Sequence, residues 1–186
     1  MSVVAAKWTL EDYHRMIESG LLDNRRVELI RGKVIEMAPE GKPHAHFSTK
    51  AGNYLVRLLG DAAEVRPAKP ITLPNNSEPE PDVAIVHPLE DEYLTHHPYP
   101  ENIFWLIEYS NATLKKDLEL KTQIYAEAGV PEYWVVNLKN HSVIVFREPK
   151  NGQYTSETRF TQGSHITPLA FPNISIPVDR LVRKAI

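Results

Sequence analysis

The 186-residue chain has the hydrophobic content (42%) and charged content (24%) of an ordinary soluble globular protein, enough to bury one sizeable core. It has no cysteine, which excludes disulfide bridges and thiol chemistry and leaves carboxylates and histidines as the metal ligands to consider. No segment is long and apolar enough to span a membrane, and the apolar run 3–6 is too short for a signal peptide. We therefore expect a cytoplasmic, single-domain protein spanning residues 1–186.

The net charge of −3 is unevenly distributed along the chain. Residues 61–110 hold 2 Lys/Arg against 10 Asp/Glu, a balance of −8, whereas the segments before and after them are slightly basic. A solvated acidic loop at residues 90–92 explains part of this excess, and a divalent metal site would explain more, because hard cations need clustered oxygens. The chain lacks the net positive charge expected of a protein that binds nucleic acid regardless of sequence, so any such binding requires a local basic patch.

The N-terminal third predicts a helix, a hairpin and a second helix. Residues 9–19 carry Thr9 as a cap with Asp12 three residues on, and residues 27–37 form two β-rich arms around the turn Arg31-Gly32. Residues 44–59 show helical spacing of apolar side chains.

Two residues of this third have more than one interpretation. Glu28 lies inside the first hairpin arm, either on an exposed face or as an inward carboxylate. His44 stands at the start of the second helix, either as a plain surface residue or facing a phosphate together with the helix N-terminus.

Two short apolar strands follow an edge-like strand over residues 64–73 and carry one acid each. Asp82 begins the run 82–86, and Glu108 ends the run 103–107. If these strands are antiparallel neighbours, Asp82 faces Glu108, and Leu106 and Phe104 continue the same face. Two carboxylates that close repel each other unless a metal ion or a shared proton intervenes.

A strand-helix-strand unit is predicted over residues 103–136. Its helix is preceded by cap-forming residues 110–113, and Gly129 and Pro131 end it. Lys121 lies on the apolar stripe of that helix, with Leu114, Leu118, Tyr125 and Ala128. Its ammonium either snorkels to the surface or points at an anion, for which Glu108 is the nearest candidate.

Beyond residue 136 the chain predicts further strands and a closing helix. Residues 135–146 form a hairpin around Lys139-Asn140, and residues 153–160 form a strand after the turn Asn151-Gly152. These strands either extend the sheet or form a β-flap, and we expect them to offer a surface for a homodimer. Residues 178–182 form a short helix, and His165 is expected in a surface loop.

A set of motifs spreads over nearly the whole chain: Val27-Glu28-Leu29-Ile30-Arg31-Gly32, Gly41-Lys42-Pro43-His44-Ala45, Pro81-Asp82, Glu108-Tyr109-Ser110, Asp117, Lys121, Tyr125 and Gly129-Val130-Pro131-Glu132-Tyr133-Trp134. With these motifs the chain resembles the Uma-two family of endonucleases, in the PD-(D/E)XK superfamily of restriction-endonuclease-like nucleases. The most specific part of the resemblance is the segment 129–134. The implied fold is α/β (α+β), a restriction-endonuclease-like core with a central mixed β-sheet flanked by helices and additional β-hairpins.

The resemblance implies a Mg²⁺-dependent endonuclease, with Mn²⁺ able to substitute, that hydrolyses phosphodiester bonds of nucleic acid, DNA being the expected substrate. Asp82 and Glu108 would be metal ligands together with the backbone carbonyl of Tyr109. Ser110 occupies the place of the lysine in E-X-K, so Lys121 would supply the amine from the next helix. Glu28 and His44 resemble further catalytic residues of such enzymes. The alternative is an inactive nucleic-acid-binding or protein-interaction module on the same fold.

Overall fold

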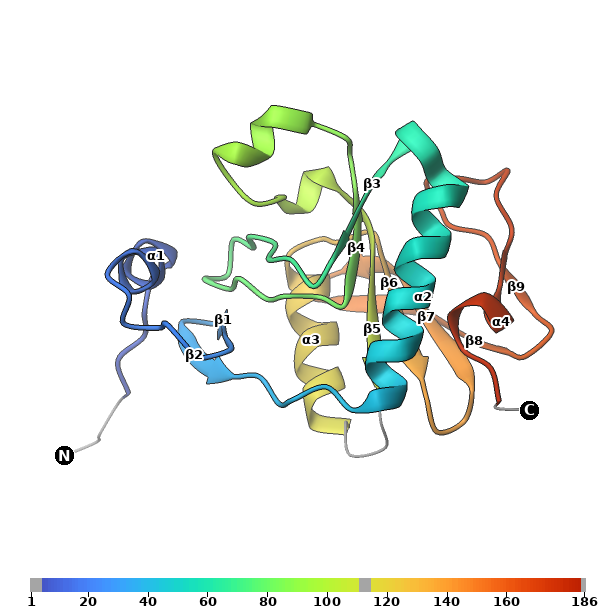
Figure 1. Cartoon of the computed structure of the whole chain (residues 1–186), viewed down its shortest axis with the longest axis horizontal. Helices are drawn as coiled ribbons and strands as arrows, with labels where there is room; N and C mark the ends of the chain where they lie inside the picture. Colours follow the sequence, from blue (N-terminus) through green and yellow to red (C-terminus); the bar gives the residue numbers. More distant parts are fainter. Residues whose placement is uncertain (1–4, 111–114, 185–186) are drawn as a thin grey trace.

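The protein is built around a six-stranded mixed β-sheet with strand order β3-β4-β5-β6-β7-β8 (Figure 1). The computed structural model describes residues 5–110 and 115–184, and for residues 115–118 it describes the backbone alone. Neighbouring strands are antiparallel except for the parallel pair β5 and β6. The strands are β3 (Glu64–Pro67), β4 (Val83–Val86), β5 (Ile103–Ser110), β6 (Glu132–Asn137), β7 (Ser142–Lys150) and β8 (Gln153–Thr161).

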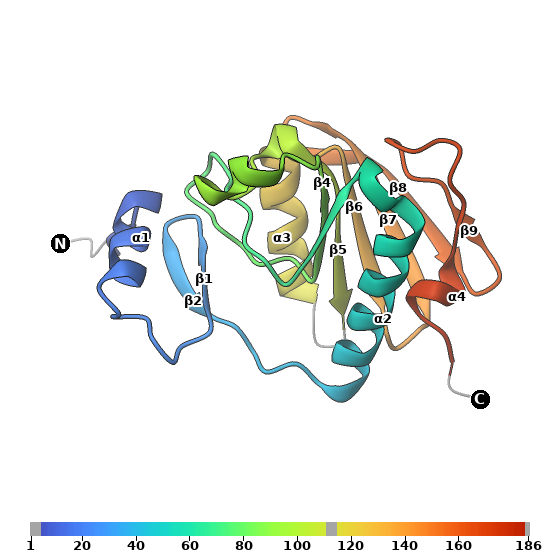
Figure 2. The same cartoon turned by 45° about the horizontal axis from the view of Figure 1, so that its top comes forward.

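Helices cover both faces of this sheet (Figures 1 and 2). Helix α2 (Lys42–Leu59) and the short helix α4 (Val178–Leu181) pack on one face, in a core that includes Trp105, Ile107 and Trp134. Helix α3 (Lys115–Glu127) packs on the other face, in a core that includes Leu106, Tyr133 and Val135. Burial on both faces agrees with the unbroken apolar runs of β5 and β6, which leave neither face of these strands polar.

The predicted strand-helix-strand unit is β5, α3 and β6. Gly129 follows α3 with a φ of +79°, in the left-handed region that glycine adopts at little cost, so the chain can turn into β6. A helical crossover is the usual connection between parallel strands, because two such strands cannot be joined by a tight hairpin. Residues 111–113 of the predicted helix cap lie outside the described part of the chain. So do Leu114 and the side chain of Leu118, which were predicted to lie on the apolar stripe of the helix.

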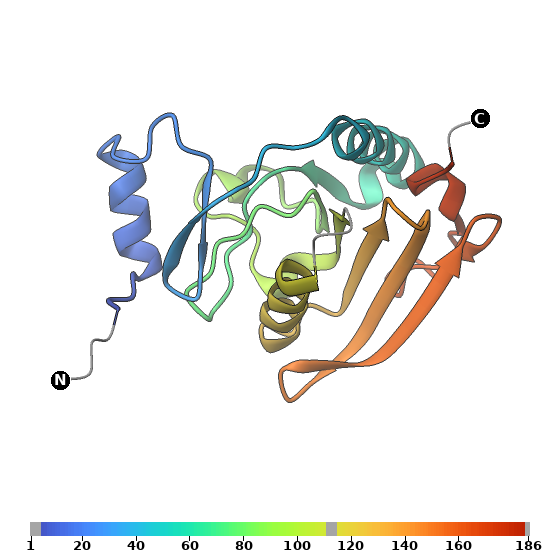
Figure 3. The same cartoon turned by 90° about the horizontal axis from the view of Figure 1, so that it is seen from below.

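The N-terminal elements lie beside one end of the sheet (Figure 3). Helix α1 (Leu10–Glu18) carries the predicted capping box between Thr9 and Asp12. Strands β1 (Val27–Ile30) and β2 (Lys33–Glu36) form the predicted hairpin around Arg31 and Gly32, both with positive φ. A small core of Tyr13, Val27 and Leu29 joins this helix to the hairpin.

Three sequence-based boundaries differ in the structure. Helix α2 begins at Lys42, two residues earlier than predicted, because Gly41 is its N-cap and proline fits the first turn. Strand β3 ends at Pro67 and does not run on to residue 73, because proline has no backbone N–H to donate to the hydrogen-bond ladder. Phe104 does not share the face of Leu106: the register shifts between Ile85 and Val86, and this bulge turns Phe104 toward the opposite core.

The C-terminal strands extend the main sheet, so the β-flap alternative does not hold. His165 is exposed, as expected, but lies in the short strand β9 (His165–Ile166), which pairs with β10 (Ile176–Pro177), and not in a loop. Among the described residues, no helix has both the length and the apolar character needed to cross a membrane.

Candidate functional site

Two carboxylates meet where β4 begins and β5 ends. Val83 pairs with Ile107 and Ala84 with Leu106, so the same register carried back by one residue sets Asp82 opposite Glu108. The side chains are 15% and 10% exposed, respectively, and both line a pocket of about 270 Å³. The antiparallel register predicted from the sequence is therefore observed.

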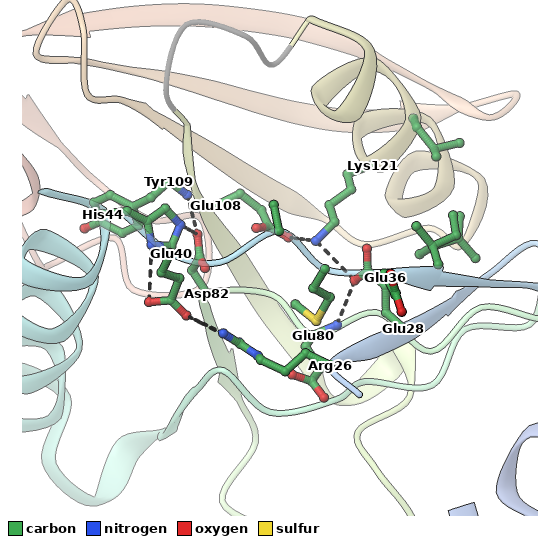
Figure 4. Close-up of a pocket in the computed structure, with 15 residues that line it drawn as sticks. Arg26, Glu28, Glu36, Glu40, His44, Glu80, Asp82, Glu108, Tyr109 and Lys121 are labelled. Atoms are coloured by element: carbon green, nitrogen blue, oxygen red, sulfur yellow. Dashed lines mark hydrogen bonds and ion pairs between the residues drawn. The ribbon is translucent and has the colours of Figure 1, made fainter. Parts of the chain in front are cut away.

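Glu108 is held through one of its two oxygens. Its Oε1 accepts a hydrogen bond from Lys121 Nζ at 2.8 Å (Figure 4) and another from the Tyr125 hydroxyl at 2.9 Å. Lys121 thus turns inward to the carboxylate and does not snorkel to the surface. None of the hydrogen bonds or ion pairs found within residues 5–110 and 115–184 involves its Oε2.

Asp82 is held in the same one-sided way, on the side facing α2. Its Oδ2 accepts the backbone N–H of Tyr109 at 2.6 Å and lies 2.9 Å from His44 Nε2. His44 is not a plain surface residue, since its side chain is only 16% exposed. Burial lowers the pKa of His44, but the hydrogen bond and charge of Asp82 outweigh this and raise it above its ordinary value.

Glu28 adopts the inward one of its two predicted orientations. Its Oε2 lies 3.4 Å from Lys121 Nζ and accepts the backbone N–H of Glu80 at 3.3 Å. The hairpin β1–β2 thereby closes one wall of the pocket, which sequence-local patterns cannot show. All five predicted site side chains, Asp82, Glu108, Lys121, Glu28 and His44, and the backbone of Tyr109 line this one pocket.

The pocket carries an excess of negative charge. Burial raises the pKa of Glu108 to about 7, and the charges of Asp82 and Glu28 add to the rise although Lys121 opposes it. Burial lowers the pKa of Lys121, but the carboxylates of Glu108 and Glu28 more than offset this and raise it above its ordinary value. One lysine thus stays charged among three carboxylates, an arrangement that a bound cation would stabilise.

The donor set suits a hard cation that keeps part of its water shell. Within the described parts of the chain, no three His, Asp or Glu side chains are grouped so as to hold a metal ion by themselves. Mg²⁺ is usually bound through one or two carboxylates, with water and substrate phosphate completing its shell. Asp82 and Glu108, each with one oxygen that has no described partner, fit that pattern.

Four charged residues of the pocket were missed by the sequence analysis. Glu36 lines it from the end of β2, and Arg26, Glu40 and Glu80 line it from loops, where no periodic pattern marks them. Of the loop residues, Glu80 alone had a usable signal, because it stands two residues before Asp82 and alternate residues of an extended segment share a face. The hydrogen bond from Tyr125 to Glu108 was also missed, although both residues belong to the predicted motif.

Comparison with known proteins places the chain in a family. The model of the Uma2 family, described as "Putative restriction endonuclease", matches residues 10–179. The chain belongs to the Uma2 family. The resemblance drawn from the sequence motifs is thus confirmed. A search of curated proteins finds no match.

A solved structure shows the same fold as this Uma2 protein. It is described as a "putative nuclease belonging to DUF820 from Anabaena variabilis ATCC 29413" and superposes with a TM-score of 0.74 at 14% sequence identity. The match covers 93% of this chain and 96% of the other. At that identity the likeness establishes the fold alone, and it confirms the predicted core of a mixed sheet flanked by helices with additional hairpins.

Proposed function

We propose that this protein is a Mg²⁺-dependent endonuclease, with Mn²⁺ as a substitute, that hydrolyses phosphodiester bonds in nucleic acid, DNA being the expected substrate. Membership of a family described as "Putative restriction endonuclease" supports the reaction class. The observation that carries the proposal is the pair Asp82 and Glu108, each held through one oxygen beside a buried, charged lysine.

Asp82, Glu108 and the backbone carbonyl of Tyr109 would hold the metal ion. When bound, the ion would lower the pKa of a water molecule and offset negative charge on the phosphodiester. The protein's own contribution is to fix the ligands in place beforehand. Tyr125 and Lys121 fix Glu108, while His44 and the Tyr109 amide fix Asp82.

Lys121 would act through its charge. Its raised pKa keeps it protonated near neutral pH, so it cannot serve as the general base. A fixed ammonium beside the scissile phosphate would stabilise the negative charge that develops on the phosphorus oxygens, or orient the attacking water. Lys121 thereby supplies, from α3, the amine that Ser110 does not supply at the third position of E-X-K.

Glu28 and His44 have supporting roles in this proposal. Glu28 lies 3.4 Å from Lys121 Nζ and so limits where the ammonium can point. His44 lies at the rim of the pocket, against Asp82, and could face a substrate phosphate in its charged form. We further propose that residues 1–186 act as a single domain and that the protein works as a homodimer.

The competing function is an inactive nucleic-acid-binding or protein-interaction module on the same fold. Two observations favour it: Ser110 in place of the E-X-K lysine, and the balance of −8 over residues 61–110. Such a module would keep the fold but would not need a metal ion.

A plasmid-nicking assay separates the two functions. Wild-type protein is incubated with supercoiled DNA and with single-stranded DNA or RNA in Mg²⁺, Mn²⁺ or EDTA, beside Glu108→Gln. We expect nicking in Mg²⁺ or Mn²⁺, none in EDTA and none by Glu108→Gln. Equal strand breakage by wild type and Glu108→Gln would point to a contaminant, and no breakage of any substrate by the wild type would favour the inactive module.

A further inference from the structure

The outer edge of β8 is the long open edge of the main sheet. The strand spans nine residues and is the last in the strand order, outermost in Figure 3. In the described part of the chain, residues 153–160 make no backbone hydrogen bond to any segment other than β7. Unpaired N–H and C=O groups along such an edge are a template for another strand.

The opposite edge of the sheet, formed by β3, is protected against pairing with another strand, whereas the edge formed by β8 is not. Strand β3 has only four residues and ends in Pro67, and proline cannot donate to a ladder. The Arg66 side chain is bound to Glu64 within the same strand, at 2.7 Å. Strand β8 contains no proline and no residue with positive φ, so nothing in its backbone blocks pairing.

The sequence of β8 is complementary to itself when two copies run antiparallel. Centred on Thr158, the pairing sets Glu157 opposite Arg159 of the second copy at two symmetric positions, and Thr155 opposite Thr161. Centred on Glu157 or on Arg159, it would set like charges against each other. Both charged side chains are exposed, and neither has an ion pair among residues 5–110 and 115–184.

We propose that two copies of the protein associate through antiparallel pairing of β8 with β8, centred on Thr158. The main chain would supply the hydrogen bonds of the ladder, and the Glu157–Arg159 pairs would fix the register. A twofold contact of this kind uses up both edges, so it closes as a dimer and does not propagate into a fibre. The two six-stranded sheets would become one continuous sheet.

This arrangement keeps the two candidate sites apart. Strand β5 lies three strands from β8, so seven strand spacings of ~4.8 Å, or about 34 Å, would separate the two copies of β5. None of the residues that line the pocket belongs to β8. The dimer therefore does not complete the site, and the inference stands or falls independently of nuclease activity.

Charge reversal at the two paired positions tests the register. Sedimentation equilibrium of the full chain is compared for wild type, Glu157→Arg, Arg159→Glu and the double exchange of both. Each single change places two like-charge pairs at the interface, so we expect the dimer dissociation constant to rise about tenfold or more. The double exchange restores opposite charges and should return the constant to near the wild-type value.

A matched control removes the effect of net charge. Lys139→Glu changes the net charge as Arg159→Glu does, but at an exposed turn between β6 and β7, and should leave the dimer intact. Hydrogen exchange should show β8 amides that are protected in the dimer and exposed in the Arg159→Glu monomer. A wild type that is monomeric at every concentration, single variants that dimerise as the wild type does, or a double exchange that fails to recover would each overturn the proposal.

Discussion

Two buried glutamates on neighbouring strands have very different surroundings. Glu132, at the start of β6, is fully buried, and both of its oxygens are satisfied. Its Oε1 accepts from Arg147 Nη2 at 2.6 Å and from the Trp134 indole at 2.8 Å, while Oε2 accepts the Leu169 N–H at 2.7 Å. Glu108, at the end of β5, is held through Oε1 alone and shares its pocket with further carboxylates.

The difference separates a structural carboxylate from the one that we propose as a metal ligand. Glu132 neutralises Arg147 and ties β6 to β7 and to the chain at Leu169, which is a complete explanation of its presence. Glu108 has a pKa raised to about 7, because burial and the carboxylates of Asp82 and Glu28 disfavour its ionised form more than Lys121 favours it. Folding alone gives no reason to keep such a group, whereas a cation-binding site does.

The largest expected effect on stability lies at the structural member of this pair. Glu132→Ala leaves Arg147 without its carboxylate and three donors without an acceptor, so we expect it to lower the free energy of unfolding by about 3–5 kcal/mol. Urea denaturation measures this loss. Glu108→Gln should change stability far less, because it removes a charge that burial and the nearby carboxylates disfavour more than Lys121 favours it. Equal destabilisation by the two substitutions would break the comparison.

The next effect concerns the rate of nicking at the proposed metal site that contains Glu108. Lys121→Met keeps much of the side-chain volume but removes the charge beside Glu108, so nicking should slow by about 10²- to 10³-fold. Titration calorimetry should show that metal binding persists, because both carboxylates remain. A variant that cleaves at the wild-type rate would exclude Lys121 from the proposed role.

A smaller effect is expected from the hydroxyl that orients Glu108. Tyr125→Phe removes the 2.9 Å hydrogen bond to Oε1, and we expect metal affinity to fall about 10- to 100-fold with the fold retained. Tyr133→Phe is the matched control: its ring is equally buried, 5.0 Å from that of Tyr125, and its hydroxyl has no hydrogen-bond partner in the part of the chain that the structure describes. If both variants bind Mn²⁺ equally well, Tyr125 does not position the ligand.

The smallest effect is a pH dependence of metal binding. Because the raised pKa of Glu108 lies at about 7, its carboxyl group is ionised above that pH and must lose a proton to bind a cation below it. Affinity should be constant above pH 7 and fall by up to about tenfold per pH unit below it. Calorimetry between pH 5.5 and 8.5 measures this, and a flat profile would contradict the raised pKa.

Much of the fold could be predicted from local sequence. The Thr9–Asp12 capping box, the Arg31-Gly32 turn and the apolar runs ending at Glu108 each depend on residues close in the chain, where short-range chemistry decides the structure. The bulge that turns Phe104 away could not be predicted, because it arises between two strands that are distant in sequence.

The candidate site could be predicted only in part, for the same reason. Strand register brought Asp82 and Glu108 together, and helical spacing put Lys121 on the buried side of α3. Whether Glu28 and His44 point inward depends on how the hairpin and α2 pack against the sheet, which no local pattern contains. Arg26 and Glu40 enter from loops and left no signal at all.

Titration calorimetry with Mn²⁺ at pH 8 tests the central claim most directly, with wild type compared to the double variant Asp82→Asn/Glu108→Gln. We predict saturable binding to the wild type that is lost in the double variant, while circular dichroism shows both chains folded. Wild-type protein that binds no metal ion, or a double variant that binds as tightly as the wild type, would contradict the assignment of these two carboxylates as the metal ligands.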